Sequence, residues 1–304
     1  MIPDYQTLML PLLKLVSDKQ EHKYRDLIEK LAIDFQLTEV ERKELLDSGN
    51  QSIFDNRVGW AKTYLKNAGL LESPKRATFV ITETGLITLK NNPNRIDAKY
   101  LRKFPSFLEF QKASRNENDT EEEIINVETN HQTPDENFDK AYQRIRKSLA
   151  SELLNKVFEF SPTFFERLVV ELVVKMGYGG SIKEAGRAIG KSGDEGIDGI
   201  IKEDKLGLDI IYIQAKRWKP GNVVGRPELH KFVGALAGQG AKKGIFITTS
   251  NFTKEALEYT PKNETKIVLI NGEQLSQLMI DYNLGCTTQE TYELKKIDID
   301  YFEE

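Results

Sequence analysis

The sequence is poor in the two side chains that build most transition-metal sites. It has 304 residues, of which one is a cysteine, Cys286, and three are histidines that lie far apart. One cysteine excludes an intrachain disulfide and any zinc module built from Cys-x-x-Cys pairs, and the scattered histidines disfavour a His/Cys site. Any metal would therefore be held by oxygen ligands, which Mg²⁺ and Mn²⁺ prefer.

The sequence also lacks a long apolar run and an excess of either charge. No segment approaches the roughly 18 apolar residues of a membrane helix, and the first residues lack the basic segment of a signal peptide, so we expect a cytoplasmic protein. The 43 Lys and Arg residues are nearly balanced by 47 Asp and Glu residues, for a net charge of −4. This balance excludes a uniformly basic coat for nucleic acid but leaves a local basic patch open.

The length is typical of two domains of roughly 150 residues each, and one change of composition divides the chain. From about residue 112 to 137 the sequence is acidic and polar with few large apolar residues, so it cannot bury enough surface to offset its ordering entropy. We predict an N-terminal domain over residues 1–95, a linker over 96–137, an α/β domain over 138–285 and a C-terminal tail over 286–304.

The N-terminal domain shows helical patterns followed by a short hairpin. Apolar residues recur at helical spacing from the start of the chain, and Thr38 with Glu41 has the spacing of a capping box. A further predicted helix over Asp55–Ala68 precedes two apolar runs, at 70–71 and 79–81, with a basic turn between them. Helices followed by such a hairpin are typical of a winged helix-turn-helix domain.

On this interpretation the N-terminal domain has five candidate DNA contacts. The helix over 55–68 would enter the major groove, and basic side chains on its outer face and at the hairpin tip would contact phosphates. These side chains are Arg57, Lys62, Lys66, Lys75 and Arg76. The alternative is that they form only a solvated helix face and a solvated turn, which is the usual role of charged residues on a helix exterior.

The C-terminal domain begins with two predicted helices. The first covers 138–158, and Ser161-Pro162 then has the sequence of a helix start, with serine as N-cap and proline as first residue. Glu166 falls just beyond the edge of the apolar stripe of this second helix. From there it could reach into a cleft, although an ordinary solvated glutamate would occupy the same position.

A predicted hairpin brings three polar residues together. Apolar residues occupy both faces of the strand at 208–216, as in a central strand covered on both sides. Gln214 and Lys216 share a face because side chains alternate along a strand, and Asp198 lies just before the neighbouring strand at 200–201. Because a buried lysine needs a partner, Asp198 with Lys216 is either a structural ion pair or a site for a metal and a water.

The remainder of the domain alternates between helical and strand patterns, which favours an α/β fold with a mixed central sheet and helices on both faces. The predicted strands cover 243–249 and 265–270, and the predicted helices 227–239, 252–259 and 273–282.

Three motifs of this domain resemble a known nuclease core. They are Phe165-Glu166, Gly193-x-x-Gly196-Ile197-Asp198-Gly199 and Gln214-Ala215-Lys216. Together they are similar to the PD-(D/E)xK nucleases, and more narrowly to the Mrr family of restriction endonucleases, over essentially the whole chain. The resemblance implies a winged helix-turn-helix domain followed by a restriction-endonuclease-like α/β domain.

The resemblance also implies a role for each polar residue. Asp198 would match the first metal-binding aspartate, Lys216 the catalytic lysine, and Glu166 the helix glutamate that completes the site. Gln214 stands where the wider superfamily has Asp or Glu, in agreement with the Mrr-like variant. A glutamine oxygen can bind Mg²⁺ or Mn²⁺ but brings no charge, so one metal ion is as consistent with this site as two.

The resemblance thus implies a metal-dependent endonuclease that cuts double-stranded DNA bearing methylated adenine or cytosine. Because one chain has one such site, cutting both strands would need a homodimer or a higher homo-oligomer. Two alternatives stay open. One is a non-catalytic DNA-binding regulator with a degenerate nuclease fold, and the other is a repair nuclease that recognises DNA structure.

Overall fold

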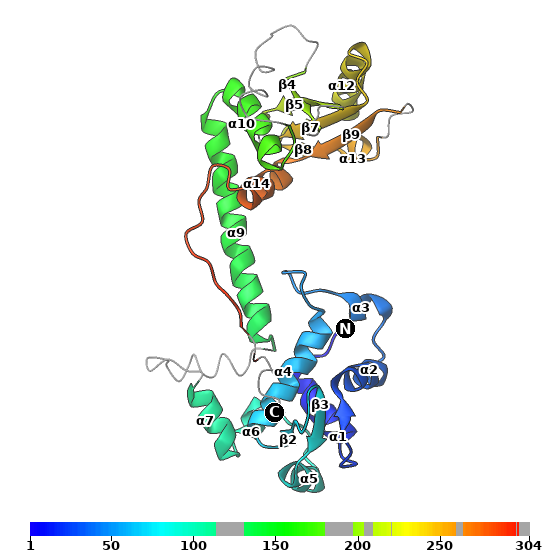
Figure 1. The fold of residues 1–304 in the computed structure, drawn as a ribbon, viewed down its shortest axis with the longest axis vertical. Helices are drawn as coiled ribbons and strands as arrows, with labels where there is room; N and C mark the ends of the chain where they lie inside the picture. The colour runs from blue at the N-terminus through cyan, green and yellow to red at the C-terminus, as the bar shows by residue number, and fades with distance from the viewer. Residues whose placement is uncertain are drawn as a thin grey trace. The chain divides into compact units, whose positions relative to one another are not determined.

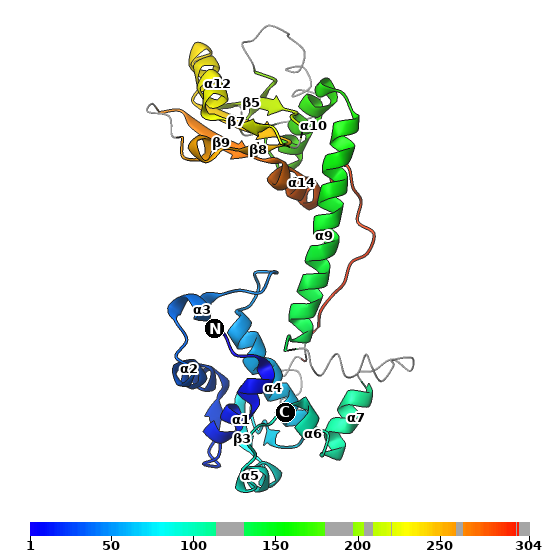
Figure 2. The ribbon, with the colours of Figure 1, turned by 180° about the vertical axis from the view of Figure 1, so that it is seen from behind.

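A computed structural model describes residues 1–113, 131–179, 197–203, 209–219, 221–259, 264–295 and 297. The chain forms two compact units, Met1–Arg144 together with the C-terminal residues from Leu294, and Ile145–Glu293 (Figures 1 and 2). The long helix α9, Pro134–Glu159, begins in the first and ends in the second. Within the described ranges no helix is both long and apolar enough to cross a bilayer.

The first unit is mainly helical and contains a small antiparallel sheet with strand order β1-β3-β2. Its strands are β1 (His22–Lys23), β2 (Leu71–Glu72) and β3 (Thr78–Ile81). Its helices, besides the start of α9, are α1 (Tyr5–Leu15), α2 (Tyr24–Asp34), α3 (Glu39–Lys43), α4 (Ile53–Asn67), α5 (Glu83–Lys90), α6 (Ala98–Leu101) and α7 (Pro105–Ala113). The helical patterns and the hairpin predicted for this region are therefore present.

Side-chain caps explain where several of these helices begin. Asp4 accepts the backbone N–H groups of Gln6 and Thr7 at the start of α1, each at 2.9 Å. Thr38 and Glu41 form the predicted capping box at the start of α3, which satisfies two N–H groups that have no partner inside the helix.

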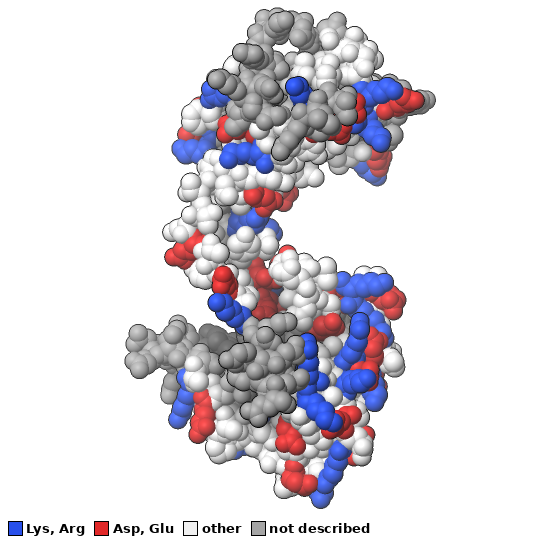
Figure 3. All heavy atoms as spheres, viewed as in Figure 1, with Lys and Arg blue, Asp and Glu red and all other residues white. Residues whose placement is uncertain are grey.

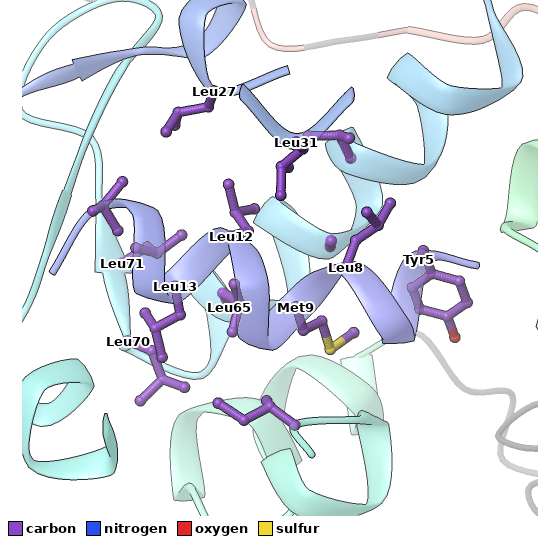
Figure 4. Packing of buried hydrophobic residues seen from close by; sticks show 14 of the residues in the cluster. Tyr5, Leu8, Met9, Leu12, Leu13, Leu27, Leu31, Leu65, Leu70 and Leu71 are labelled. Atoms are coloured by element: carbon purple, nitrogen blue, oxygen red, sulfur yellow. The ribbon is translucent and has the colours of Figure 1, made fainter. Parts of the chain in front are cut away.

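Figure 4 shows the core of the first unit, in which α1 lies at the centre. Its apolar face, Leu8 to Leu13, packs against leucines of α2 and α4 and against Leu70 and Leu71 beside the hairpin. Leu101 of α6 and Phe107 of α7 are also fully buried in this core. The N-terminal unit therefore continues past residue 95, into the stretch that the sequence led us to assign to a linker.

The second unit is built on a four-stranded sheet with the order β4-β5-β7-β9. Strand β4 runs antiparallel to β5, whereas β5, β7 and β9 are parallel, so the mixed α/β fold predicted from the sequence is confirmed. The sheet strands are β4 (Gly199–Lys202), β5 (Ile210–Lys216), β7 (Lys243–Thr248) and β9 (Lys266–Ile270), and a two-stranded ladder joins β6 (Val223–Val224) to β8 (Asn251–Phe252). The helices are the end of α9, then α10 (Pro162–Lys175), α12 (Arg226–Gly238), α13 (Lys254–Leu257) and α14 (Gly272–Asp281).

Helices cover both faces of this sheet (Figure 1). On one face, Ile211 and Ile213 of β5 share a core with α9, α10 and α14. On the other face, Phe246 of β7 packs with α12, and Tyr212 of β5 lies against the same cluster. Strand β5 is therefore a central strand covered on both sides, as its apolar residues predict.

Candidate active site

Asp198 is held at the edge of the sheet by two hydrogen bonds to β5. Its backbone N–H donates to the carbonyl of Ile213 at 2.8 Å, and its carboxylate oxygen Oδ2 accepts the N–H of Ala215, also at 2.8 Å. One bond fixes the backbone and the other fixes the side chain. The carboxylate is thus anchored beside the strand that carries Gln214 and Lys216.

Gln214 and Lys216 occupy alternate positions at the end of β5. The Gln214 side chain is buried, with 4% of the residue exposed, while Lys216 is partly exposed as the last residue of the strand. By strand alternation both share the face of Tyr212, which packs toward α12. On this face of the sheet, the Gln214 amide is therefore buried and the Lys216 ammonium lies at the end of the strand, partly exposed to solvent.

Glu166 joins this group from helix α10. Ser161 caps the helix by accepting the N–H of Phe164 at 3.1 Å, and Glu166 lies in the following turn. Burial raises the pKa of the Glu166 carboxyl, repulsion from Asp198 raises it further, and attraction to Lys216 opposes both effects. Glu166 therefore lies close enough to Asp198 and Lys216 for their charges to affect it, and a shared active site of the three residues stays a prediction of the sequence motifs.

Asp198 is in a similar electrostatic environment. Burial raises the pKa of its carboxyl, and the Ala215 N–H and the Lys216 ammonium lower it by a smaller amount. The ionised forms of both carboxylates are therefore disfavoured, and the charge of Lys216 opposes this effect. A bound cation would stabilise both ionised forms.

The oxygen atoms available at this site fit a hard divalent cation. Asp198 and Glu166 supply carboxylate oxygens, and Gln214 supplies an amide oxygen. Within the described ranges no cluster of three or more His, Cys, Asp and Glu residues could hold a metal. Such all-oxygen sets suit magnesium-like ions rather than zinc.

Gly199 explains how α10 comes close to Asp198. A Cβ atom at this position would lie 2.7 Å from Cγ2 of Val170 on α10, which is shorter than any tolerable contact. Glycine therefore allows the helix that carries Glu166 to pack directly on β4. The other two glycines of the predicted motif, Gly193 and Gly196, lie outside the described residues.

Sequence reasoning missed a group of buried hydroxyls next to this site. Thr248 and Thr249 both donate hydrogen bonds to the segment that follows β5, at the carbonyls of Lys216 and Trp218. The signal available in the sequence was a run of polar residues, Thr248 to Ser250, directly after an apolar strand. That pattern is also typical of an ordinary turn, so it did not identify these residues.

The predicted role of Arg57 in contacting DNA does not agree with the structure. Its guanidinium pairs with Glu136 at 2.8 Å and also donates to the carbonyl oxygen of Ile2 at 2.8 Å. The side chain is only 16% exposed. Arg57 does not project into solvent because α4 packs against the start of α9 along this side, and we assign it a structural role.

The other four basic candidates differ in their exposure to solvent and in their intramolecular contacts. The Lys62 ammonium lies over the rings of Tyr24 and Phe79, at 4.9 and 5.2 Å, and burial, with a smaller effect of Lys66, lowers its pKa. Lys66 is exposed on α4.

At the hairpin tip, Lys75 pairs with Glu21 at 3.1 Å, and Arg76 is exposed. Figure 3 shows Lys and Arg interspersed with Asp and Glu on the visible face of the first unit. On that face the basic side chains therefore form no continuous surface.

Comparison with known proteins defines the class of both units. Residues 157–279 match the family model described as a restriction endonuclease, and residues 5–91 match the Mrr N-terminal domain. The type IV methyl-directed restriction enzyme EcoKMrr of Escherichia coli K12 is 36% identical over 308 aligned positions, which cover 99% of each chain.

The chain therefore belongs to the Mrr family of restriction endonucleases. It is an endodeoxyribonuclease, a hydrolase that breaks phosphodiester bonds in DNA. A catalytic domain of this type depends on a divalent metal.

Two solved structures show weaker similarity. The DNA modification-dependent restriction endonuclease AspBHI is 16% identical and has a TM-score of 0.35, with 45% of this chain and 35% of the other covered. The MspJI restriction endonuclease, solved in complex with a 27-mer oligonucleotide, is 23% identical with the same TM-score, over 46% of this chain and 33% of the other.

Proposed function

We propose that this chain is a magnesium-dependent endonuclease that cuts double-stranded DNA bearing methylated bases. The observation that carries the proposal is the Asp198 carboxylate, which accepts the Ala215 N–H at 2.8 Å beside the strand that carries Gln214 and Lys216, with Glu166 close enough for their charges to affect its pKa. The name of the Escherichia coli relative, methyl-directed, supports the requirement for modified DNA. The target base is methylated adenine or cytosine.

Each residue of the site has a distinct task. Asp198, Glu166 and the Gln214 oxygen would hold Mg²⁺, with Mn²⁺ as a substitute. The bound cation would neutralise charge on the phosphate and on the two carboxylates. The Lys216 ammonium, at the rim of the sheet, donates hydrogen bonds that hold the attacking water or a phosphate oxygen in line.

The N-terminal unit would bind and orient the DNA as a winged helix-turn-helix domain. Lys66 of α4 and both Lys75 and Arg76 at the hairpin tip are exposed, and Lys62 and Lys75 could exchange their intramolecular contacts for phosphates. Each chain carries one site of this kind, so a homodimer or higher homo-oligomer would cut both strands. Its DNA substrate is consistent with a cytoplasmic protein.

A plasmid prepared with and without DNA methylation tests this proposal. The purified chain and Asp198→Ala would each be incubated with both plasmids, in Mg²⁺ and in EDTA. The expected result is cleavage of the methylated plasmid alone, in Mg²⁺ alone and by the unmutated chain alone. Binding of both plasmids without cleavage would favour a DNA-binding regulator, and cleavage of unmodified branched DNA would favour a repair nuclease.

A further inference from the structure

Three consecutive hydroxyl side chains at the end of β7 bind the segment that leaves β5. Thr248 Oγ1 donates to the carbonyl of Lys216 at 2.9 Å, and Thr249 Oγ1 donates to the carbonyl of Trp218 at 2.8 Å. Ser250 Oγ donates to the carbonyl of Asn222. The three residues are 0%, 3% and 6% exposed, so these hydrogen bonds are shielded from water.

The Lys216 carbonyl is the most strongly held of these three groups. It also accepts the backbone N–H of Thr249, at 3.2 Å. Thr248 Oγ1 in turn accepts the N–H of Ser250 at 3.1 Å, which fixes the direction in which the hydroxyl donates. The β5–β7 ladder ends at the pair Lys216–Thr248, so the hydroxyls continue the pairing where the backbone ladder stops.

A buried hydroxyl can be satisfied by an acceptor close in sequence and does not need one from a distant segment. Ser276, at 2% exposed, donates to the carbonyl of Glu273 three residues earlier in its own helix, and Thr88 donates in the same local way to Thr84. The Thr248–Ser250 hydroxyls instead reach residues 28 to 32 positions away. All three reach the same segment, and that segment begins with the lysine of the active site.

We propose that Thr248, Thr249 and Ser250 are positioning residues for Lys216, an inference that rests on the proposed function. A lysine has four rotatable side-chain bonds and lies here at the end of a strand, so its ammonium is placed well only if its backbone is held. Catalytic groups lose activity steeply when displaced by about 1 Å. The hydroxyls hold the Lys216 carbonyl and the turn after it, and thereby fix where the ammonium points relative to Asp198 and Glu166.

The substitution Thr248→Val tests this inference because it removes the hydroxyl with little change in shape. We expect kcat on methylated plasmid to fall about ten- to a hundredfold, with KM and plasmid affinity unchanged. Thr248→Ser restores the hydroxyl and should restore most of the activity. Ser276→Ala is the matched control, since it removes an equally buried hydroxyl of the same unit that does not touch the 216–222 segment.

Thermal unfolding of every variant separates positioning from folding. The inference is overturned if Thr248→Val and Ser276→Ala lose the same activity per folded molecule, or if Thr248→Ser is as inactive as Thr248→Val. If Thr248→Val does not fold, Thr249→Val carries the test, because it removes the Trp218 bond while its backbone N–H still binds Lys216. Failure of the proposed function would be distinct, because the unmutated chain would then leave the plasmid uncut.

Discussion

Each unit of this protein contains a pair of acidic side chains. The two pairs differ in whether hydrogen-bond donors of the same unit satisfy them. In the first unit Glu136 is 7% exposed, and its carboxylate accepts from the Arg57 guanidinium and from the Thr133 N–H, both at 2.8 Å. Beside it Asp135 accepts from Asn56 at 2.6 Å and from the Trp60 indole at 3.0 Å. These carboxylates are satisfied by partners of the same unit.

In the second unit burial raises the pKa of the carboxyls of both Asp198 and Glu166, and the charge of Lys216 opposes this effect. Their ionised forms are therefore less stable than they would be in water, and a cation would relieve the cost. The comparison teaches that a buried acid with a full set of donors stabilises the fold, whereas an incompletely partnered acid marks a binding site.

The largest effect is expected for Asp198→Asn. It retains an oxygen that can accept the Ala215 N–H but loses the charge that would hold the metal. We expect cleavage to fall by on the order of 10³-fold, while the unfolding temperature stays the same or rises because a disfavoured charge is removed. Plasmid cleavage and thermal unfolding measure the two quantities. A variant that keeps its activity, or loses it together with its fold, would contradict this assignment.

In the first unit we expect a loss of stability, in contrast to the loss of cleavage without destabilisation expected for Asp198→Asn. Glu136→Ala leaves the buried Arg57 without its carboxylate, which typically costs about 3–5 kcal/mol. Urea unfolding should show this loss in the N-terminal transition. The control is Glu159→Ala, which removes an ion pair with Lys156 whose two side chains are well exposed and should cost about 0–1 kcal/mol. Equal effects of the two variants would refute the distinction between buried and exposed pairs.

A smaller effect is expected for Gly199→Ala. The added methyl group would meet Val170 of α10 at 2.7 Å, so the helix must shift away from β4. Overpacking of this kind costs about 1–3 kcal/mol, and the shift should also move Glu166 away from Asp198 and weaken Mg²⁺ binding. Gly234→Ala is the control, because nothing lies within 4 Å of a Cβ atom there. Unaltered metal binding in Gly199→Ala would show that this contact does not set the position of Glu166.

The smallest effect is a dependence of stability on pH in metal-free buffer. Raised pKa values mean that the folded chain binds protons at Asp198 and Glu166 more tightly than the unfolded chain does. Their contribution to the free energy of unfolding therefore falls as pH rises from the ordinary values, 3.8 and 4.5, through the raised ones. As the pH rises above about 4, Asp198→Asn should therefore become progressively more stable relative to the unmutated chain. A constant difference in unfolding free energy would contradict the raised pKa of Asp198.

Local patterns predicted most of the fold. The sheet strands follow from short apolar runs, and Ser161 and Thr38 start helices as expected because caps depend on residues close in sequence. Helix α5 was missed because Thr84, Gly85 and Thr88 weaken its helical pattern. The helix predicted over 252–259 is shorter, at Lys254–Leu257, because Phe252 pairs with β6.

For the candidate functional residues too, the sequence predicts local relations but not long-range ones. Asp198, Gln214 and Lys216 lie on neighbouring strands of a hairpin, so spacing alone could bring them together. Arg57 was misjudged because its partner, Glu136, is 79 residues away in a stretch that composition assigned to a linker. Long-range partners of this kind decide whether a charged side chain is bound or free, and no local pattern contains them.

The most direct test of this account is a calorimetric titration of Mg²⁺ into the metal-free protein, carried out with the unmutated chain, Asp198→Asn and Glu136→Gln. We expect saturable binding to the unmutated chain and to Glu136→Gln, and none to Asp198→Asn. Equal binding by the unmutated chain and Asp198→Asn would contradict it, because the incompletely partnered carboxylates would then not be the metal site.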